Sequence, residues 1–272
     1  MPELCITIIS GIKKVPDIAV GTLIGSNIAH VSLVLGLAAI IKPFKINKTL
    51  KNSDVFMFFT TSGIASLLLW NNELTKLKGI LLLLLFIATF SWIIVKEILF
   101  IQNQSPTKPI YIQYPTTKIN HKFSNILISI LWLIFGVIAL HISSHFVVES
   151  AQNISIVLGI TNLSVGLLLL GIGTNLPELA IMLASIYNNE RDLALGGVLG
   201  ANIVGITLAL GLSGIISPTR LPDIFRERDL TSMMIITTIF SLLLLHRKKI
   251  ISRIHGVILL ILYGTYVAST FI

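Results

Sequence analysis

The sequence predicts an all-α polytopic membrane protein, and three observations support this fold class. The composition is too apolar for a soluble chain of 272 residues, because 54% of residues are hydrophobic, only 12% are charged and the mean hydropathy is +0.91. Apolar runs such as Ile80–Ile94 are too long and too free of charge to be soluble cores. The Lys and Arg residues that give the net charge of +8 lie in short connectors between such runs. We therefore expect the lipid bilayer as a partner and exclude nucleic acid.

Eight apolar segments are predicted to cross the bilayer, and a partial ninth span begins the chain. The spans are expected near 18–41, 55–70, 79–101, 124–148, 160–187, 193–216, 230–246 and 254–271, with the partial span at 2–12. The longest polar connector, 102–123, contains prolines and charged residues and is too short to hold a folded domain. The chain is therefore divided into a first half at 1–101, a loop at 102–123 and a second half at 124–272.

Basic residues are divided unequally between the connectors on the two sides of the membrane. When the predicted spans alternate in direction, thirteen Lys and Arg residues fall on one side and seven on the other. Cytoplasmic loops are enriched in Lys and Arg, so the side with thirteen is predicted to be cytoplasmic. The loop at 102–123 is then cytoplasmic and the C-terminus lies outside, in a multi-pass protein of the cytoplasmic (inner) membrane.

The chain contains an internal repeat with an offset of 175 residues. Residues 2–43 align without a gap on residues 177–218, and 18 of the 42 positions are identical. The identities include Pro-Glu and Gly-x-x-x-Gly-x-Asn, which chance similarity between apolar segments would not produce. Five spans separate equivalent segments, so the two copies are predicted to cross the membrane in opposite directions. Inverted repeats of this kind are typical of secondary transporters, whose substrate site lies near the midplane between the repeats.

The segment "GIGTNLPELAIM", residues 171–182, places polar residues and a proline inside an apolar span. Pro177 cannot donate a backbone hydrogen bond, so it leaves a carbonyl free to face a cavity or an ion. Thr174 and Asn175 add side-chain oxygens, and Glu178 adds a carboxylate that is costly in a membrane unless paired, protonated or bound to a cation. An all-oxygen set of this kind suits Ca²⁺ better than zinc or copper. The alternative is a proline-kinked helix whose Glu is protonated or paired.

The first copy of the repeat places a second carboxylate in the equivalent position. Glu3 also follows a proline, so a pseudo-twofold axis would bring it face to face with Glu178. Two unpaired carboxylates at one midplane repel each other, and a bound cation relieves the repulsion. Asn27 and Asn202, on the next segment of each copy, supply amide oxygens or form hydrogen bonds between helices. Glycines four residues apart in the same segments allow close helix packing.

These residues resemble the two alpha-repeats of the sodium/calcium exchanger family, within the cation/Ca²⁺ exchanger superfamily. The family motif is Gly-Thr-Ser-x-Pro-Glu on one helix and a Gly-Ser-Asn-rich stretch on the next. "GIGTNLPEL" and "VLGANI" are similar to the second repeat, "PEL" and "LIGSNIAH" to the first, and the short central loop resembles prokaryotic members. The resemblance implies ten transmembrane helices and exchange of cytoplasmic Ca²⁺ for Na⁺, or for H⁺ in some members. It implies no enzyme activity and no cofactor besides the transported ions.

The resemblance also implies a set of ion-binding residues. The two motif glutamates, the main Ca²⁺ ligands of the family, map to Glu3 and Glu178. The other candidates on the matching segments are Thr174, Asn175, Ser26, Asn27 and Asn202. Three positions depart from the pattern, because His30 and Gly205 stand where Asn or Asp is expected, and Ala201 stands in place of Ser. His30 is either a protonatable group that links transport to pH or a hydrogen-bonded packing residue.

The largest departure lies at the start of the sequence. Met1 aligns with Leu176, so the first half has no counterpart of the roughly 50 residues, 124–176, that precede the Pro-Glu of the second half. A truncated reading frame, from a wrong start site or a disrupted gene, is the simplest interpretation. Three functions stay open: a Ca²⁺/Na⁺ (or H⁺) antiporter, a transport-inactive membrane protein kept as a partner subunit or remnant, and a proton-coupled cation exchanger that uses His30.

Two charged clusters lie outside the matching motifs. His141, His145 and Glu149 share one helix face at a spacing that can bind zinc, although a polar edge at the membrane interface is the more usual reason for it. Residues 223–229 alternate acidic and basic side chains, and we expect them to form a solvated connector.

Overall fold

The two repeated segments form the centre of a helical bundle. The computed structural model describes residues 2–45, 52–103, 123–188, 190–245 and 250–270. The central part of the first copy is α2 (Pro16–Ala29), the π-helical turn η1 (His30–Val34) and α3 (Leu35–Ile41). The central part of the second copy is α10 (Arg191–Val204), the π-helical turn η3 (Gly205–Ala209) and α11 (Leu210–Ile216). Every boundary is shifted by the offset that relates the two sequences, so the repeat extends to the helix geometry.

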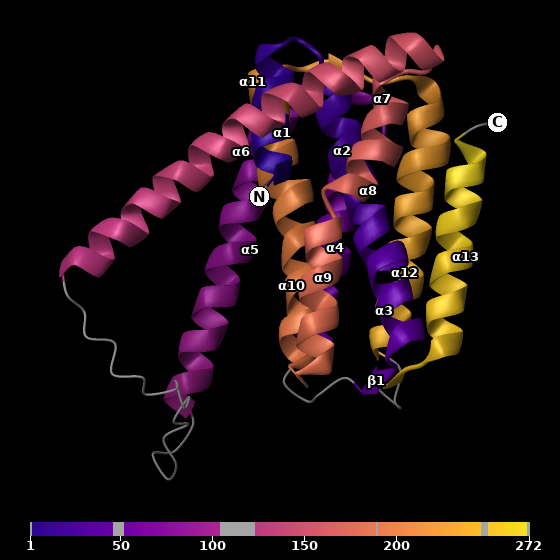
Figure 1. Ribbon diagram of the computed structural model, residues 1–272. Helices are drawn as coiled ribbons and strands as arrows, with labels where there is room; N and C mark the ends of the chain where they lie inside the picture. The colour runs from indigo at the N-terminus through magenta and orange to yellow at the C-terminus, as the bar shows by residue number, and fades with distance from the viewer. Residues whose placement is uncertain (1, 46–51, 104–122, 189, 246–249, 271–272) are drawn as a thin grey trace.

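The two copies run in opposite directions through the bundle, as the sequence predicts. Figure 1 shows α3 reaching the lower end, beside β1 (Phe44–Lys45), whereas α11 lies at the upper end. Each copy begins with a shorter helix, namely α1 (Pro2–Ile12) and α9 (Leu176–Tyr187). Both short helices start near mid-height and run to opposite ends of the bundle (Figure 1).

In the second half, further helical turns lead into α9. They are α7 (Asn162–Val165), the π-helical turn η2 (Gly166–Leu170) and α8 (Gly171–Gly173). Thr174 and Asn175 interrupt the helix before α9 begins, with Pro177 in its first turn. The break predicted from the proline is therefore present, because proline fits the first turn of a helix but not its interior.

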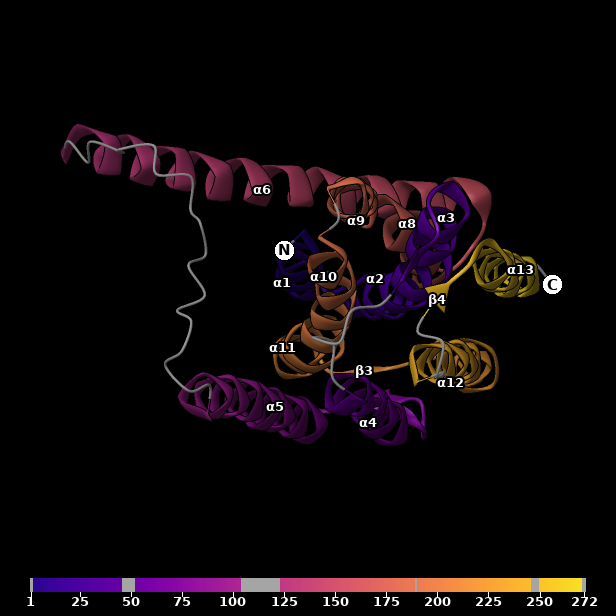
Figure 2. The ribbon, with the colours of Figure 1, turned by 90° about the horizontal axis from the view of Figure 1, so that it is seen from below.

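The remaining helices surround the repeats in a symmetric way. They are α4 (Asn52–Leu69), α5 (Lys76–Asn103), η4 (Phe225–Leu230) with α12 (Thr231–Leu245), and α13 (Arg253–Ser269). α5 packs against α11, and its repeat equivalent α13 packs against α3. The long helix α6 (Phe123–Leu158) crosses the outside of the bundle and contacts α1 (Figure 2).

Two short antiparallel strand pairs tie the first half of the chain to the second. β1 pairs with β4 (Ile250–Ile251), and Phe44 lies opposite Ile251. β2 (Glu73–Leu74) pairs with β3 (Thr219–Arg220), and Glu73 lies opposite Arg220. β1 follows α3 and β3 follows α11, so the two pairs close opposite ends of the bundle.

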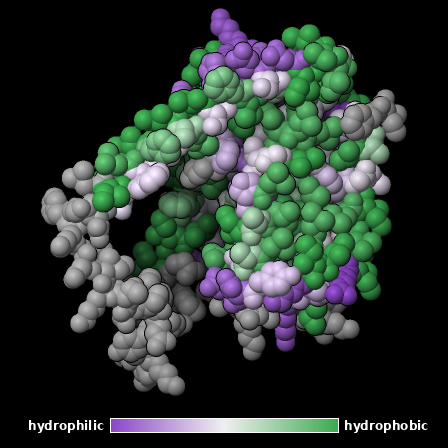
Figure 3. Space-filling model, in the orientation of Figure 1, coloured by the Kyte–Doolittle hydropathy of each residue, from purple (hydrophilic) through white to green (hydrophobic). Residues whose placement is uncertain are grey.

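Six helical segments among the described residues are long and apolar enough to cross a membrane. They are Pro16–Ile41, Lys76–Lys96, Ile128–Leu158, Asn162–Tyr187, Leu193–Ile216 and Phe225–Leu245. The spans predicted at 55–70 and 254–271 coincide with α4 and α13, which fall short of this criterion, so the count of eight full spans is not confirmed. Figure 3 shows hydrophobic residues over most of the middle of one face and hydrophilic residues toward its two ends, as expected for a multi-pass protein.

The span Pro16–Ile41 is the most deeply enclosed of the six, with 78% of its apolar window buried, whereas the corresponding figure for Ile128–Leu158 is 6%. Glycines let α2 approach its neighbours so closely. A Cβ atom on Gly25 would lie 2.1 Å from the carbonyl oxygen of Leu167, and one on Gly21 would lie 2.4 Å from that of Leu163. Only glycine permits this backbone contact.

Candidate cation-binding site

The two carboxylates predicted from the repeat occupy equivalent positions near the centre of the bundle. Glu3 lies in the first turn of α1 and Glu178 in the first turn of α9. A helix N-terminus carries a partial positive charge, so it stabilises a carboxylate placed there. Since the two helices run from mid-height to opposite ends, both acidic turns face the middle of the bundle (Figure 1).

Both carboxylates line a single cavity of about 180 Å³. The polar side chains that share its wall are those of Glu3, Ser26, Asn27, His30, Glu178 and Asn202. These six were all singled out from the sequence. The apolar part of the wall comes from both halves and includes Leu23 of α2 and Val204 of α10. The cavity is thus assembled from the two copies of the repeat.

Thr174 and Asn175 do not line the cavity but hold the helix break against α2. The hydroxyl oxygens of Thr174 and Ser26 are 3.0 Å apart, and the Asn175 amide donates to the Ser26 carbonyl oxygen at 3.1 Å. The Thr174 hydroxyl is also 2.9 Å from the Leu170 carbonyl oxygen. These contacts fix the position of α9, and with it Glu178, relative to the cavity.

His30 and Asn202 are joined across the repeat. Nδ1 of His30 lies 2.8 Å from Oδ1 of Asn202, and the Asn27 side chain donates to the Asn202 backbone carbonyl at 3.4 Å. An amide oxygen only accepts hydrogen bonds, so Nδ1 is the donor and Nε2 carries the lone pair in the neutral ring. The ring therefore presents an acceptor nitrogen at the cavity wall.

Several buried polar atoms around the cavity have no hydrogen-bond partner among the described residues. They are Asn27 Oδ1, His30 Nε2, Asn175 Oδ1, Glu178 Oε2 and Asn202 Nδ2. Each such atom costs about 1–3 kcal/mol if it stays unsatisfied. All but the last are acceptors, so a cation or ordered water would satisfy them, whereas Asn202 Nδ2 is a donor and suits a carbonyl or water.

The chemistry of the site favours a hard cation. Among the residues that the structure describes, no three His, Cys, Asp or Glu side chains are grouped so as to hold a metal ion. A cation in the cavity would therefore depend on two carboxylates supplemented by hydroxyl and amide oxygens. Ca²⁺ accepts about 6–8 oxygen ligands of these types, whereas zinc prefers a compact set of nitrogen and sulfur ligands.

The zinc interpretation of the α6 histidines gains no support. His145 Nδ1 is 3.7 Å from Glu149 Oε2, and the Lys13 ammonium lies 3.3 Å from the same oxygen. Glu149 thus forms an ion pair with Lys13 that links α6 to the residues following α1, which agrees with the polar-edge interpretation.

The π-helical turns η1 and η3 could not be read from the sequence. They begin at His30 and Gly205, the two repeat-equivalent positions where the family pattern has Asn or Asp. A π-helical turn widens the helix by one residue and is frequent at functional sites. The sequence hinted at these turns only in that both positions depart from the family pattern.

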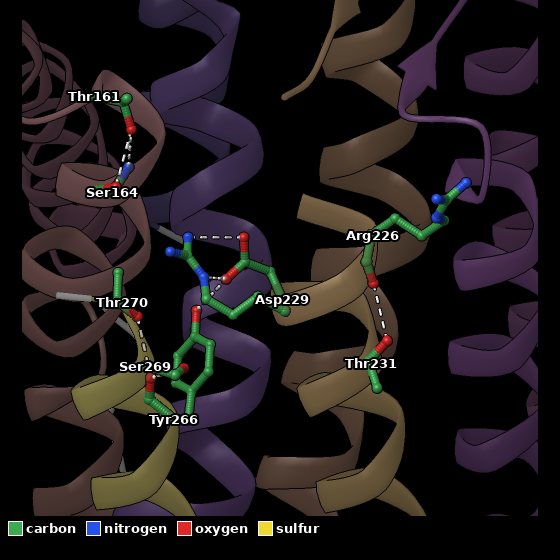
Figure 4. Close-up of polar contacts among 9 residues, drawn as sticks. Thr161, Ser164, Arg226, Asp229, Thr231, Tyr266, Ser269 and Thr270 are labelled. Carbon is green, nitrogen blue, oxygen red and sulfur yellow. Dashed lines mark hydrogen bonds and ion pairs between the residues drawn. The ribbon is translucent and has the colours of Figure 1, made fainter. Parts of the chain in front are cut away.

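The prediction that residues 223–229 form a solvated connector is wrong for Asp229, which is fully buried at the end of η4. The Arg228 guanidinium donates to both of its carboxylate oxygens, at 2.9 and 3.2 Å, and the Tyr266 hydroxyl donates to one of them at 3.3 Å. Figure 4 shows Tyr266 of α13 pointing toward Asp229. The sequence did not indicate this burial. Arg228 and Asp229 are adjacent, so the ion pair looks like part of an exposed pattern of alternating charges.

The architecture and the cavity together define a multi-pass membrane protein with an inverted repeat that places two carboxylates on one central cavity. The family described as "Sodium/calcium exchanger protein" matches residues 1–95 and 128–272. The chain therefore belongs to the sodium/calcium exchanger family of antiporters. The resemblance read from the motifs is confirmed at this level.

Named relatives cover almost the whole chain. It is 30% identical over 261 residues to the inner membrane protein YrbG of Escherichia coli, an alignment that covers 95% of this chain and 78% of YrbG. It is 32% identical over 276 residues to the putative antiporter CaxA of Alkalimonas amylolytica, with 97% and 82% covered. It is 26% identical over 298 residues to the sodium/calcium exchanger MaX1 of Methanosarcina acetivorans, with 100% and 85% covered.

Solved structures of the sodium-calcium exchanger NCX_Mj share the fold. One, soaked with Na⁺ and Ca²⁺, matches with a TM-score of 0.67 and 25% identity, covering 99% of this chain and 82% of its own. Another, soaked with Na⁺ and Sr²⁺, matches with a TM-score of 0.68 and 26% identity over the same shares. The named relatives are exchangers and membrane proteins rather than enzymes, so the chain is a membrane transporter by family.

Proposed function

We propose that the chain exchanges Ca²⁺ for Na⁺ across the cytoplasmic membrane, with Glu3 and Glu178 as the principal cation ligands. The observation that carries this proposal is the meeting of two carboxylates, each on a half-helix of opposite direction, at one cavity of about 180 Å³. Ser26, Asn27 and Asn202 would supply further polar contacts from the central helices. MaX1 and NCX_Mj are named as sodium/calcium exchangers, so Na⁺ and Ca²⁺ are the pair of ions to test first.

Electrostatics explains how such a site would couple the two ion flows. An acidic side chain at the centre of a membrane helix costs about 2.5–3.5 kcal/mol, and two of them also repel each other. One divalent ion, or monovalent ions in its place, neutralises the same pair of carboxylates. The loaded site is close to neutral, whereas the empty site is not. The conformational change that moves access to the site from one side of the membrane to the other is therefore favoured only when ions are bound. The two kinds of ion then compete for one site and move in opposite directions.

Thr174 and Asn175 are proposed to act from the edge of this site. Their hydrogen bonds to Ser26 hold the helix break in place, and the unpaired Oδ1 of Asn175 remains available to an ion that enters the turn. Substituting either residue would therefore displace the Glu178 side chain and would also remove a side-chain oxygen from the edge of the site.

Proton coupling is the second candidate function, and His30 favours it. His30 lines the cavity that the two carboxylates share, and its buried Nε2 has no hydrogen-bond partner among the described residues. A proton on Nε2 would place a positive charge beside the carboxylates, where it would compete with a bound cation. A transport-inactive chain, kept as a partner subunit or a remnant, is the third interpretation.

We further infer the topology and the division of the chain. The halves 1–101 and 124–272 would each contribute one copy of the repeat, with the loop 102–123 cytoplasmic and the C-terminus outside. Most of that loop, residues 104–122, lies outside the described residues. The boundaries of the central helices in the first half differ from those in the second half by one constant offset, and this supports the division into two halves.

Ca²⁺ uptake into everted membrane vesicles tests these interpretations. Uptake would be driven first by a Na⁺ gradient and then by a pH gradient. Glu178→Gln removes the charge while keeping the shape, and uptake should fall to background. Glu149→Gln is the matched control, because this carboxylate is exposed on α6 and should be dispensable. His30→Asn should abolish pH-driven uptake alone if the imidazole carries the proton. Absence of uptake in both gradients, with the protein shown to be in the membrane, would refute the antiporter proposal and favour the inactive interpretation.

A further inference from the structure

The charged groups on the wall of the site cavity can be counted. Among the described residues that line it, Glu3 and Glu178 carry the carboxylates. The other oxygen-bearing side chains on the wall belong to Ser26, Asn27 and Asn202, and a hydroxyl or an amide has no charge. The described wall therefore offers a cation two negative charges when both carboxylates are ionised.

The imidazole of His30 adds no charge to this wall in its neutral form. Its Nδ1 donates to Oδ1 of Asn202 at 2.8 Å, which leaves the lone pair on Nε2. Nε2 is buried and has no hydrogen-bond partner among the described residues. A lone pair attracts a cation but does not neutralise it, so the neutral ring leaves the number of charges to be balanced at two.

Gly205, the repeat equivalent of His30, also lines the cavity. Its φ of −58° and ψ of −52° are ordinary helical values, so the backbone does not require glycine there. A Cβ atom at this position would meet no atom within 4 Å among the described residues. Neither backbone conformation nor packing therefore explains the glycine, and a side chain with a third carboxylate would fit at the cavity wall.

The number of carboxylates decides how many ions make the loaded site neutral. One Ca²⁺ balances two carboxylates, and so do two Na⁺. A site that held a third Na⁺, or only one, would carry an uncompensated charge, and a charge near the middle of a membrane is costly. The two loaded states that can change access most easily therefore hold one Ca²⁺ or two Na⁺.

We propose that the chain exchanges one Ca²⁺ for two Na⁺ without net movement of charge, and that Gly205 sets this ratio by keeping a third charge off the wall. The inference rests on the proposed Ca²⁺/Na⁺ exchange and specifies its stoichiometry. Two positive charges move in each direction per cycle, so the membrane potential does no work on the exchange. The Ca²⁺ concentration ratio reached at equilibrium then depends on the Na⁺ ratio alone.

Ca²⁺ accumulation in lipid vesicles that contain the reconstituted full chain tests this ratio. A fixed Na⁺ gradient drives uptake, and valinomycin with a K⁺ gradient imposes a potential of about 100 mV. The buffer is at about pH 8.5, where an imidazole is neutral. The wild type should reach the same Ca²⁺ ratio with and without the potential. If a third Na⁺ moved in each cycle, one net charge would cross, and the potential would change the ratio about fiftyfold.

Two substitutions of one glycine test its role. Gly205→Asp adds a third carboxylate to the wall, so three Na⁺ would be needed to balance it, and the Ca²⁺ ratio should become dependent on the potential. Gly205→Asn is the matched control, because it adds a side chain of the same shape without the charge. Accumulation by Gly205→Asn should stay independent of the potential.

The outcomes separate this inference from the proposed exchange. A potential-dependent Ca²⁺ ratio in the wild type would overturn the inference and leave Ca²⁺/Na⁺ exchange intact. Equal responses of Gly205→Asp and Gly205→Asn to the potential would overturn the role of Gly205. If Gly205→Asp fails to fold, displacement of radioactive Ca²⁺ by Na⁺ from the wild type in detergent decides: a Hill coefficient of at most about two is expected, and about three would overturn the ratio. Absence of Na⁺-driven uptake by the wild type would overturn both proposals.

Discussion

Replacing equivalent glycines of the two repeats by alanine should have opposite effects on stability. At Gly25 the added methyl group would lie 2.1 Å from the Leu167 carbonyl oxygen and 2.7 Å from its Cα. Both contacts are with backbone, so α2 and η2 must move apart by roughly 1 Å to reach van der Waals distance. At Gly200 the same methyl group meets nothing among the described residues.

Comparing Gly25→Ala with Gly200→Ala isolates the free-energy cost of the steric clash between the added methyl group and the η2 backbone. Gly→Ala gains about 1 kcal/mol of helix propensity at either position, so this term is common to both. Overpacking costs about 1–3 kcal/mol, and contact with rigid backbone favours the upper end. Gly25→Ala should therefore unfold about 3 kcal/mol more easily than Gly200→Ala. For a chain of this size, roughly 2–4 °C accompanies each kcal/mol, which gives a difference of about 6–12 °C.

Thermal unfolding in detergent, followed by tryptophan fluorescence, measures this difference. Each variant is compared with the wild type at the same detergent and protein concentration. Gly264→Ala on α13 serves as a second open-space reference and should behave as Gly200→Ala does. Equal unfolding temperatures for Gly25→Ala and Gly200→Ala would refute the argument that the two repeats differ in what covers them.

Three other outcomes are expected. Tyr266→Phe removes the hydroxyl that donates to the buried Asp229 at 3.3 Å, so the unfolding free energy should fall by about 1–3 kcal/mol in the same melts, and no change would contradict this role. Ser26→Ala removes a hydroxyl from the cavity wall and should weaken Ca²⁺ binding several-fold by calorimetry, whereas unchanged affinity would remove this residue from the site. Breaking the exposed pair of Lys13 and Glu149 with Glu149→Gln should change the unfolding free energy by less than about 1 kcal/mol, with a smaller effect in high salt.

The arrangement of the central helices was predictable because the sequence contains an internal repeat. Hydropathy placed the spans, and the gapless alignment of 2–43 with 177–218 required that both segments fold alike and cross in opposite directions. Most of the cavity wall followed from the same alignment, since Glu3 and Glu178 are related by it. The roles of these residues in ion binding remain predictions.

Other features depend on packing that a single sequence does not reveal. The π-helical turns begin at His30 and Gly205, which share no side-chain type that favours such a turn. The burial of Asp229 depends on Tyr266, which lies on a different helix. The number of full spans stays unconfirmed, because helices such as α13 are apolar but shorter than the other predicted spans.

The strand pairs also set the order in which the protein can be completed during synthesis. β1 leaves the ribosome early, but its partner β4 belongs to the connector before the last helix. β2 likewise waits for β3 in the second half. Neither half can therefore close its end of the bundle before the other has been inserted, and such non-local pairing slows folding. The nascent first half is expected to remain open until translation is almost finished.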